Sequence, residues 1–129
     1  MSTESTIAHH IKSLGDGDLE AIMADYREDS VLITPDGQLR GLTEIRTLFK
    51  KIVTVMLPPG SEFELLRQEF VGEVAYTVWR GSSESFNFLI GTDTFIVRGD
   101  AIVCQTFAAQ IQPKGLYKSL RPPAAHAPK

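Results

Sequence analysis

The sequence predicts a single α+β domain, in which three helices pack into a strongly curved antiparallel sheet that closes around a pocket. Apolar residues recur at helical spacing up to Met56, and from Ser61 onward they alternate as in β-strands. The alternation changes parity around Gly91, where a β-bulge or bend would curve the sheet. A curved sheet encloses space that a flat one does not. The length of 129 residues suits one domain with its own core.

The first helix is indicated by apolar residues spaced four and three positions apart: Ile7, Ile11 and Leu14. Gly15 and Gly17 end this helix, as glycine does past a helix C-terminus. Asp18 is a good N-cap for a second helix through Ile22, which we expect to continue into residues 26–29.

A short strand over residues 30–34 follows, and Pro35-Asp36-Gly37 predicts a turn after it. The third helix begins at Gly41 and ends before the Pro58-Pro59-Gly60 segment. Its apolar stripe is formed by Leu42, Ile45, Leu48, Phe49, Ile52 and Met56.

Four strands are expected next, over residues 61–71, 74–81, 85–98 and 101–112, with tight turns at Gly72 and Gly99. The strand 74–81 is apolar on both faces, which places it in the middle of the sheet. We predict that Tyr76 and Val78 face the pocket. Trp79 then faces outward, where a second copy of the chain would cover it in a homodimer. The domain therefore spans residues 1–112, and the proline-rich segment 113–129 is expected to be an extended or mobile tail.

Composition excludes several classes of function. The net charge is −3 and no basic face is clustered, so we expect no nucleic-acid partner. No apolar run reaches the roughly 18 residues of a membrane span, and the first residues lack a signal-peptide pattern, so a cytoplasmic protein is expected. Cys104 is the single cysteine, which rules out a disulfide within the chain. No metal-ligand spacing, phosphate loop or nucleophile elbow is present, so we expect no cofactor and no metal.

Several short motifs, taken together in order and spacing, resemble the nuclear transport factor 2-like superfamily over about residues 5–112. They are the stretch 14–20, then Tyr26, the stretch 29–31, Gly37, Gly41 and Ile45, and later the stretch 91–95, Gly99 and Ile102. The resemblance implies a cone-shaped fold with an apolar pocket, often in a homodimer. The superfamily includes ketosteroid isomerase, polyketide cyclases, dehydratases, epoxide hydrolases and pure binding domains, so the fold does not determine the function.

Three positions of this sequence correspond to the catalytic residues of ketosteroid isomerase: one residue is kept, one is replaced by another possible donor and one is lost. Asp93 falls at the oxyanion aspartate, His10 at the oxyanion tyrosine and Thr34 at the carboxylate base. Threonine is no proton base near neutral pH. The sequence therefore argues against ketosteroid isomerisation by the same mechanism.

Asp93 and His10 are nevertheless the candidate catalytic pair. A carboxylate in mid-strand must be hydrogen-bonded, neutralised or wet, and an apolar cavity would raise its pKa. It would then serve as an acid, a donor or a base; the alternative is a carboxylate satisfied by neighbouring groups. His10 lies one helical turn from Ile7 and Leu14 and is expected to point inward, whereas His9 points to solvent. The alternative for His10 is a histidine at the edge of the core.

The predicted pocket lining has both polar and apolar members. By strand parity, Gln105 shares an inward face with Phe107, and its amide would orient a polar group of a ligand. The full predicted lining is Tyr26, Thr34, Tyr76, Val78, Phe95, Gln105 and Phe107. Two functions remain open. One is a binding or dimerisation domain with a small apolar ligand; the other is a cofactor-independent isomerase, cyclase or dehydratase acting on a small hydrophobic carbonyl or hydroxyl compound.

Overall fold

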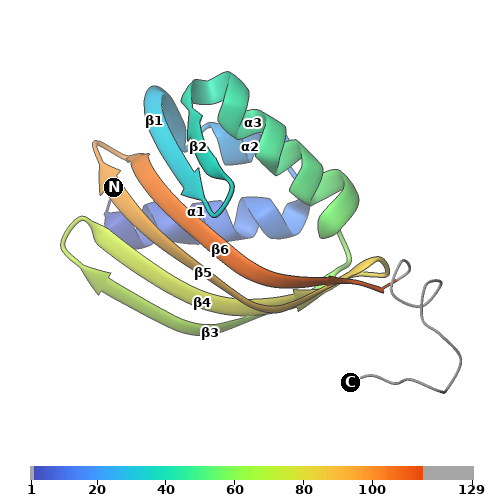
Figure 1. Cartoon of the computed structure of the whole chain (residues 1–129). Coiled ribbons are helices and arrows are strands. Elements are labelled where there is room, and N and C mark those ends of the chain that lie inside the picture. Colours follow the sequence, from blue (N-terminus) through green and yellow to red (C-terminus); the bar gives the residue numbers. More distant parts are fainter. Residues whose placement is uncertain (1, 115–129) are drawn as a thin grey trace, which may run out of the picture.

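The structure, a computed structural model, describes residues 2–114 and has an α+β architecture (Figure 1). Three helices accompany a six-stranded sheet that is not closed, with the strand order β2-β1-β6-β5-β4-β3. The four long strands curve, and helix α1 lies across the concave side of the sheet (Figure 1). The predicted fold class is thus confirmed at this level. The tail expected from residue 113 lies outside the described residues, except that Pro113 ends β6 and Lys114 follows it.

Helix α1 (Thr3–Asp16) is capped at both ends. The Ser2 side chain accepts a hydrogen bond from the Ser5 amide, and Gly17 ends the helix in the left-handed conformation (φ 66°). Its inward face carries buried residues one turn apart: Thr6, Ile7, His10 and Ser13.

Helix α2 (Leu19–Met23) is capped by Asp18, as expected, but it is shorter than predicted. The chain enters strand β1 (Tyr26–Thr34) at Tyr26 instead of remaining helical to residue 29. The reason is pairing with a distant strand: Tyr26 lies opposite Ile102, and the Asp25 carbonyl accepts the Ile102 amide at 2.7 Å. The sequence pattern around residues 24–29 contains no information about its pairing with Ile102.

Strand β2 (Gly37–Arg40) was not predicted, because it is only four residues long and mostly exposed. It forms an antiparallel hairpin with β1. On its other side β1 pairs parallel with β6. The sheet is therefore mixed, and the prediction of a wholly antiparallel sheet was wrong. Helix α3 (Gly41–Lys51) follows this hairpin and continues into a π-helical segment, Ile52–Met56.

The remaining strands are β3 (Glu62–Val71), β4 (Val74–Ser82), β5 (Phe86–Arg98) and β6 (Ala101–Pro113), close to the predicted ranges. They form an antiparallel meander. The pairing register shifts between Trp79 and Gly81 and again between Phe88 and Ile90. Both irregularities lie close to Gly91, where the sequence predicted a bulge, and such irregularities increase strand twist and bending.

Trp79 and Gly91 face each other across β4 and β5, and their contact shapes the concave side of the sheet. A Cβ atom at position 91 would lie 2.4 Å from Cε2 of Trp79, so only glycine leaves room for the indole. Trp79 is therefore buried on the inner face, which corrects the predicted outward orientation. Tyr76 and Val78 consequently lie on the outer face, and Tyr76 is 38% exposed. Hydrophobicity could not decide this parity because β4 is apolar on both faces.

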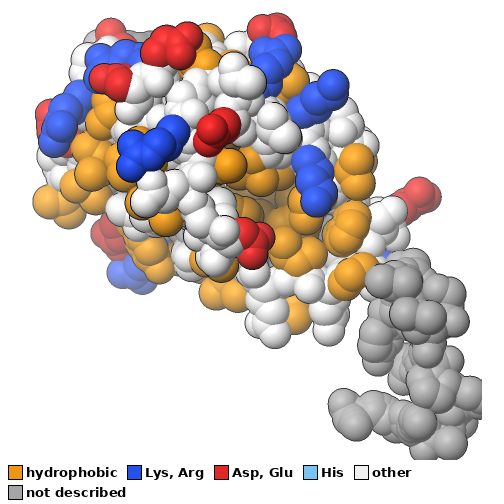
Figure 2. All heavy atoms as spheres, turned by 45° about the horizontal axis from the view of Figure 1, so that its top comes forward, with side chains coloured by type: hydrophobic (Ala, Val, Ile, Leu, Met, Phe, Trp, Pro, Cys, Tyr) orange, Lys and Arg blue, Asp and Glu red, His pale blue; other side chains and the backbone are white. Residues whose placement is uncertain are grey.

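The core between the sheet and the helices is aliphatic and aromatic. Its fully buried members include Ile7, Ile22, Leu32, Ile45 and Ile102. Other large apolar side chains remain exposed, among them Leu66, Val71 and Val74. Figure 2 shows hydrophobic side chains gathered across the middle of one face, with charged side chains concentrated toward its upper edge.

Gly91→Ala should lower the free energy of unfolding by about 1–3 kcal/mol, because the new methyl group must displace the Trp79 indole. Urea unfolding monitored by circular dichroism measures the change. The control is Gly15→Ala in α1, where an added Cβ has no neighbour within 4 Å and where alanine favours the helix by up to about 1 kcal/mol. Equal stability of Gly91→Ala and wild type would show that the indole does not need this glycine.

Candidate functional site

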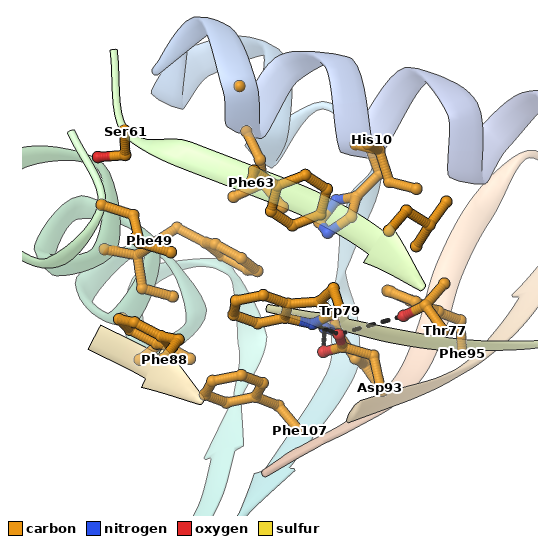
Figure 3. Close-up of a pocket in the computed structure, with 18 of the residues that line it drawn as sticks. His10, Phe49, Ser61, Phe63, Thr77, Trp79, Phe88, Asp93, Phe95 and Phe107 are labelled. Carbon is orange, nitrogen blue, oxygen red and sulfur yellow. Dashed lines mark hydrogen bonds between the residues drawn. The ribbon is translucent and has the colours of Figure 1, made fainter. Parts of the chain in front are cut away.

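An apolar pocket with a cavity of about 110 Å³ lies between the concave face of the sheet, the end of α1 and the segment from α3 to β3 (Figure 3). Residues Leu48, Phe49 and Ile52 line it from the helical side. Gly15, Glu62 and Phe63 are lining residues that are also exposed, so the mouth lies between the end of α1 and the start of β3. An apolar cavity of about 150 Å³ accepts benzene in an engineered protein. The volume therefore suits a ligand of about one ring.

Asp93 lies on the sheet wall of this pocket, where neighbouring side chains hold its carboxylate. Oδ2 accepts hydrogen bonds from Nε1 of Trp79 at 2.8 Å and from Oγ1 of Thr77 at 3.3 Å, both on the adjacent strand β4 (Figure 3). Oδ1 accepts one from Nε2 of Gln105 at 3.0 Å, on the other neighbour β6. Asp93 is buried, with 8% of its surface exposed, and its carboxylate accepts hydrogen bonds from three donors of the protein.

A second layer orients Gln105. Its Oε1 accepts a hydrogen bond from the hydroxyl of Tyr26, which is buried behind the pocket on β1. This bond leaves the amide NH₂ of Gln105 pointing at Asp93, so the orientation of the amide is set from β1. The chain of contacts from Tyr26 through Gln105 to Asp93 joins three strands of the sheet.

Burial and hydrogen bonding act on Asp93 in opposite directions. Burial raises the pKa of its carboxyl and the bonds from Trp79, Gln105 and Thr77 lower it, and the net result is a rise from 3.8 to about 6. The group is therefore mostly ionised at neutral pH. An ionised carboxylate accepts hydrogen bonds and repels an oxyanion, so Asp93 does not fit the protonated, donating role of the oxyanion aspartate in ketosteroid isomerase.

His10 also lines the pocket, from helix α1, as its labelled ring in Figure 3 shows. Its ring meets those of Tyr26, Phe49 and Phe95 edge-on, with centroids 5.4–5.9 Å apart. Burial lowers the pKa of His10 to about 3, so the imidazole is neutral at physiological pH. Within the described part of the chain, neither Nδ1 of His10 nor Oγ1 of Thr6 has a hydrogen-bond partner. No hydrogen bond joins His10 to Asp93 there either.

The structure brings together five of the predicted site residues and leaves the others apart. Lining the pocket are Asp93, His10, Phe95, Gln105 and Phe107, while Tyr26 reaches the site through Gln105.

Three predicted lining residues lie elsewhere. Thr34 is a turn residue at the end of β1, where its hydroxyl accepts from the Asp36 amide and donates to the Gly37 carbonyl. Tyr76 and Val78 lie on the outer face of β4, for the reason given above, so assigning these three residues to the pocket was wrong.

Trp79 and Thr77 are the functional residues that sequence reasoning missed. The signal that would have found Trp79 is the pairing of the largest side chain in β4 with a glycine in β5, but it requires the strand register. The aromatic residues Phe49, Phe63 and Phe88 also line the pocket and were not singled out.

An imidazole–carboxyl contact does occur in the structure, but it lies outside the pocket. Nδ1 of His9 is 2.9 Å from both carboxyl oxygens of Asp25, and the His9 side chain is 43% exposed. Burial raises the pKa of Asp25, and the contact with His9 opposes that shift. Among the residues that the structure describes, no three His, Cys, Asp or Glu side chains are grouped so as to hold a metal ion. No helix in the same part of the chain is long and apolar enough to cross a membrane.

Comparison with known proteins identifies the family. The profile of the SnoaL-like domain matches residues 7–105, which is most of the chain. The chain belongs to the SnoaL-like domain family. No curated protein matches the sequence.

Solved structures share the fold of this SnoaL-like domain at low identity. A protein from Kribbella flavida superposes with a TM-score of 0.74 at 13% identity, covering 91% of this chain and 93% of its own. A putative ketosteroid isomerase from the same organism gives 0.69 at 14%, covering 98% and 82%. An epoxide hydrolase from M. tuberculosis, described as LEH-like, gives 0.67 at 14%, covering 84% and 82%. At these identities the likeness concerns the fold alone, and the chemistry must come from the site itself.

The raised pKa of Asp93 should make the stability of the domain depend on pH. In the folded state the Asp93 carboxyl stays protonated over a pH range in which the same group in the unfolded chain has lost its proton. The resulting stability is fully present below pH 3.8 and is lost as the pH rises through about 6. Relative to Asp93→Asn, the wild type should lose roughly 3 kcal/mol between about pH 3.5 and about pH 7.5.

Urea unfolding of both proteins at the two pH values measures this difference, because other titrating groups cancel in the comparison. Asp36→Asn, in the exposed β1–β2 turn, controls for the substitution type. If the difference in unfolding free energy between wild type and Asp93→Asn does not change with pH, the pKa of Asp93 is not raised in the folded state.

Proposed function

We propose that this SnoaL-like domain binds a small, largely apolar molecule and holds a hydrogen-bond donor of that molecule against Asp93. The observation that supports it best is the buried carboxylate of Asp93 on the sheet wall of a largely apolar pocket, held by Trp79, Thr77 and Gln105. An ionised carboxylate has about four acceptor positions, and the protein fills three of them. The remaining position is available to a ligand that enters the cavity.

Two energetic contributions favour such a ligand. Apolar surface that leaves water for the pocket gains about 25 cal/mol per Å². A hydrogen bond to a charged acceptor adds about 1.5–3 kcal/mol, and it also fixes the orientation of the ligand. Asp93 is already desolvated in the free protein, so a donor that reaches it meets an acceptor with little water to displace.

A second candidate function is cofactor-independent acid–base chemistry in the same pocket. It is favoured by the pKa of about 6 at Asp93, which is near the value that suits a general base at neutral pH. The position of Thr34 in a turn and the neutral state of His10 weigh against it, because neither residue supplies a second proton-transfer group. We therefore rank binding first.

We also propose that the domain forms a homodimer through the outer face of the sheet. Three rows of neighbouring residues across β4, β5 and β6 contain no charged side chain. The rows are Val74–Ile96–Cys104, Tyr76–Thr94–Thr106 and Val78–Thr92–Ala108. Depletion of charge is typical of the centre of a protein interface.

The binding proposal predicts that p-cresol binds in the pocket more tightly than toluene by about tenfold or more, because only its hydroxyl donates to Asp93. Titration followed by ¹H–¹⁵N NMR measures both affinities, and the shifts should concentrate on lining residues such as Trp79 and Phe107. In Asp93→Asn the preference for p-cresol should shrink, because a hydrogen bond to a neutral acceptor is weaker.

Leu48→Trp, which fills the cavity from α3, should abolish binding of both compounds, whereas Thr47→Trp on the exposed side of the same helix should leave it unchanged. Shifts scattered over the surface, or no saturable binding of either compound, would rule out the pocket as a ligand site. Loss of a chemical turnover in Asp93→Asn, with binding retained, would favour the acid–base candidate.

The dimer proposal predicts twice the monomer mass in sedimentation velocity at micromolar concentration. Tyr76→Glu, which places a charge in the middle row of the outer face, should shift the protein to monomer. Thr47→Glu on the exposed face of α3 is the matched control and should remain dimeric. A wild type that sediments as a monomer would refute this interface.

A further inference from the structure

The pocket is lined largely by aromatic rings, and they surround the carboxylate on several sides. Trp79 lies at the centre: its ring is stacked on Phe107 at 6.3 Å, and Phe63 and Phe88 lie at 5.5 and 5.4 Å (Figure 3). Phe49 and Phe95 complete the set. Aromatic faces carry negative partial charge and attract cations, most strongly for tryptophan and in sites that exclude water.

The charges of the lining have one sign. It contains two carboxyl groups, Asp93 on the sheet wall and Glu62 at the mouth, and no lysine or arginine among the residues that the structure describes. His10, the remaining titratable lining residue, is neutral because burial depresses its pKa to about 3. The pocket therefore repels anions and attracts cations, and the low dielectric of its apolar walls strengthens both effects.

An ammonium group matches the free acceptor position of Asp93. Oδ1 accepts one hydrogen bond from the protein and Oδ2 accepts two, so Oδ1 has the unused capacity. An N⁺–H donor to a carboxylate makes a shorter and stronger bond than a hydroxyl does. The ring faces accept the remaining N–H groups weakly. Because Asp93 is already buried in the free protein, the desolvation cost of forming this pair is mainly that of the ammonium group.

From these observations we infer that the ligand of the pocket is a small hydrophobic amine, whose ammonium group pairs with Asp93 while its apolar body lies against the aromatic lining. The inference rests on the proposed binding function and deepens it by naming the chemical class of the ligand. The cavity of about 110 Å³ limits the body to about one ring or a branched chain of similar size.

Three single-ring probes that differ mainly in charge test the inference: benzylamine, benzyl alcohol and benzoate. We expect benzylamine to bind at least about tenfold more tightly than benzyl alcohol, because its donor is charged, and benzoate not to bind. Isothermal titration calorimetry near neutral pH, with NMR to locate the site, measures the three affinities on the full chain.

Two variants then assign the preference to a carboxyl group. Asp93→Asn should remove the advantage of benzylamine over benzyl alcohol, whereas Glu62→Gln should retain most of it. If Asp93→Asn does not fold, the wild type is titrated from about pH 7.5 to about pH 5, where primary amines stay protonated. The advantage of benzylamine should then fall as the pH drops through about 6, the pKa of Asp93, and it should do so in Glu62→Gln as well.

The outcomes separate this inference from the proposed function. Benzyl alcohol that binds in the pocket as tightly as benzylamine, or more tightly, overturns the amine assignment and leaves the binding function standing. A benzylamine preference that survives Asp93→Asn and disappears in Glu62→Gln also overturns it, because the attraction then belongs to the mouth. No pocket binding by any probe overturns both.

Discussion

The need to satisfy a carboxylate inside an apolar cavity is the constraint on which the rest of this site depends. An unpaired buried charge would cost several kcal/mol, so the carboxylate of Asp93 requires hydrogen-bond donors. Both neighbouring strands provide them. Strand β4 supplies Trp79 and Thr77, and β6 supplies Gln105. Tyr26 on β1 then determines which end of the Gln105 amide faces Asp93. Four strands are thereby linked through one carboxyl group, which the proposed ligand would contact.

The curvature of the sheet and the polarity of the site are linked through one contact. Trp79 donates to Asp93 with its indole nitrogen while its ring crosses the backbone at Gly91, two residues earlier on the same strand as Asp93. The register shifts near this contact bend β4 and β5 around the indole. The bulky ring narrows the cavity that the bend opens. Burial at this pocket depresses the pKa of His10 and raises that of Asp93.

Elements with a long, regular pattern could be predicted from the sequence, and those defined by distant partners could not. Helices α1 and α3 and the four long strands show clear periodicity in the sequence, whereas the end of α2 was misplaced. Strand β2 is too short to show one, and the start of β1 at Tyr26 depends on pairing with Ile102, seventy-six residues later. At the site, the alternation of inward and outward residues along a strand correctly predicted that Asp93, Gln105 and Phe107 line the pocket. It failed on β4, where both faces are apolar, because side-chain volume and not hydrophobicity decides which face turns inward.

Trp79 is also the only tryptophan in the chain. The protein therefore contains a single indole fluorophore, located in the pocket wall and hydrogen-bonded to the titratable group there. Its emission wavelength responds to the polarity around the ring, which changes when a molecule replaces solvent in the cavity. Its intensity responds to the charge on the carboxyl group beside it. Intrinsic fluorescence would therefore follow the ionisation of Asp93 and the entry of a molecule into the pocket, without an attached label.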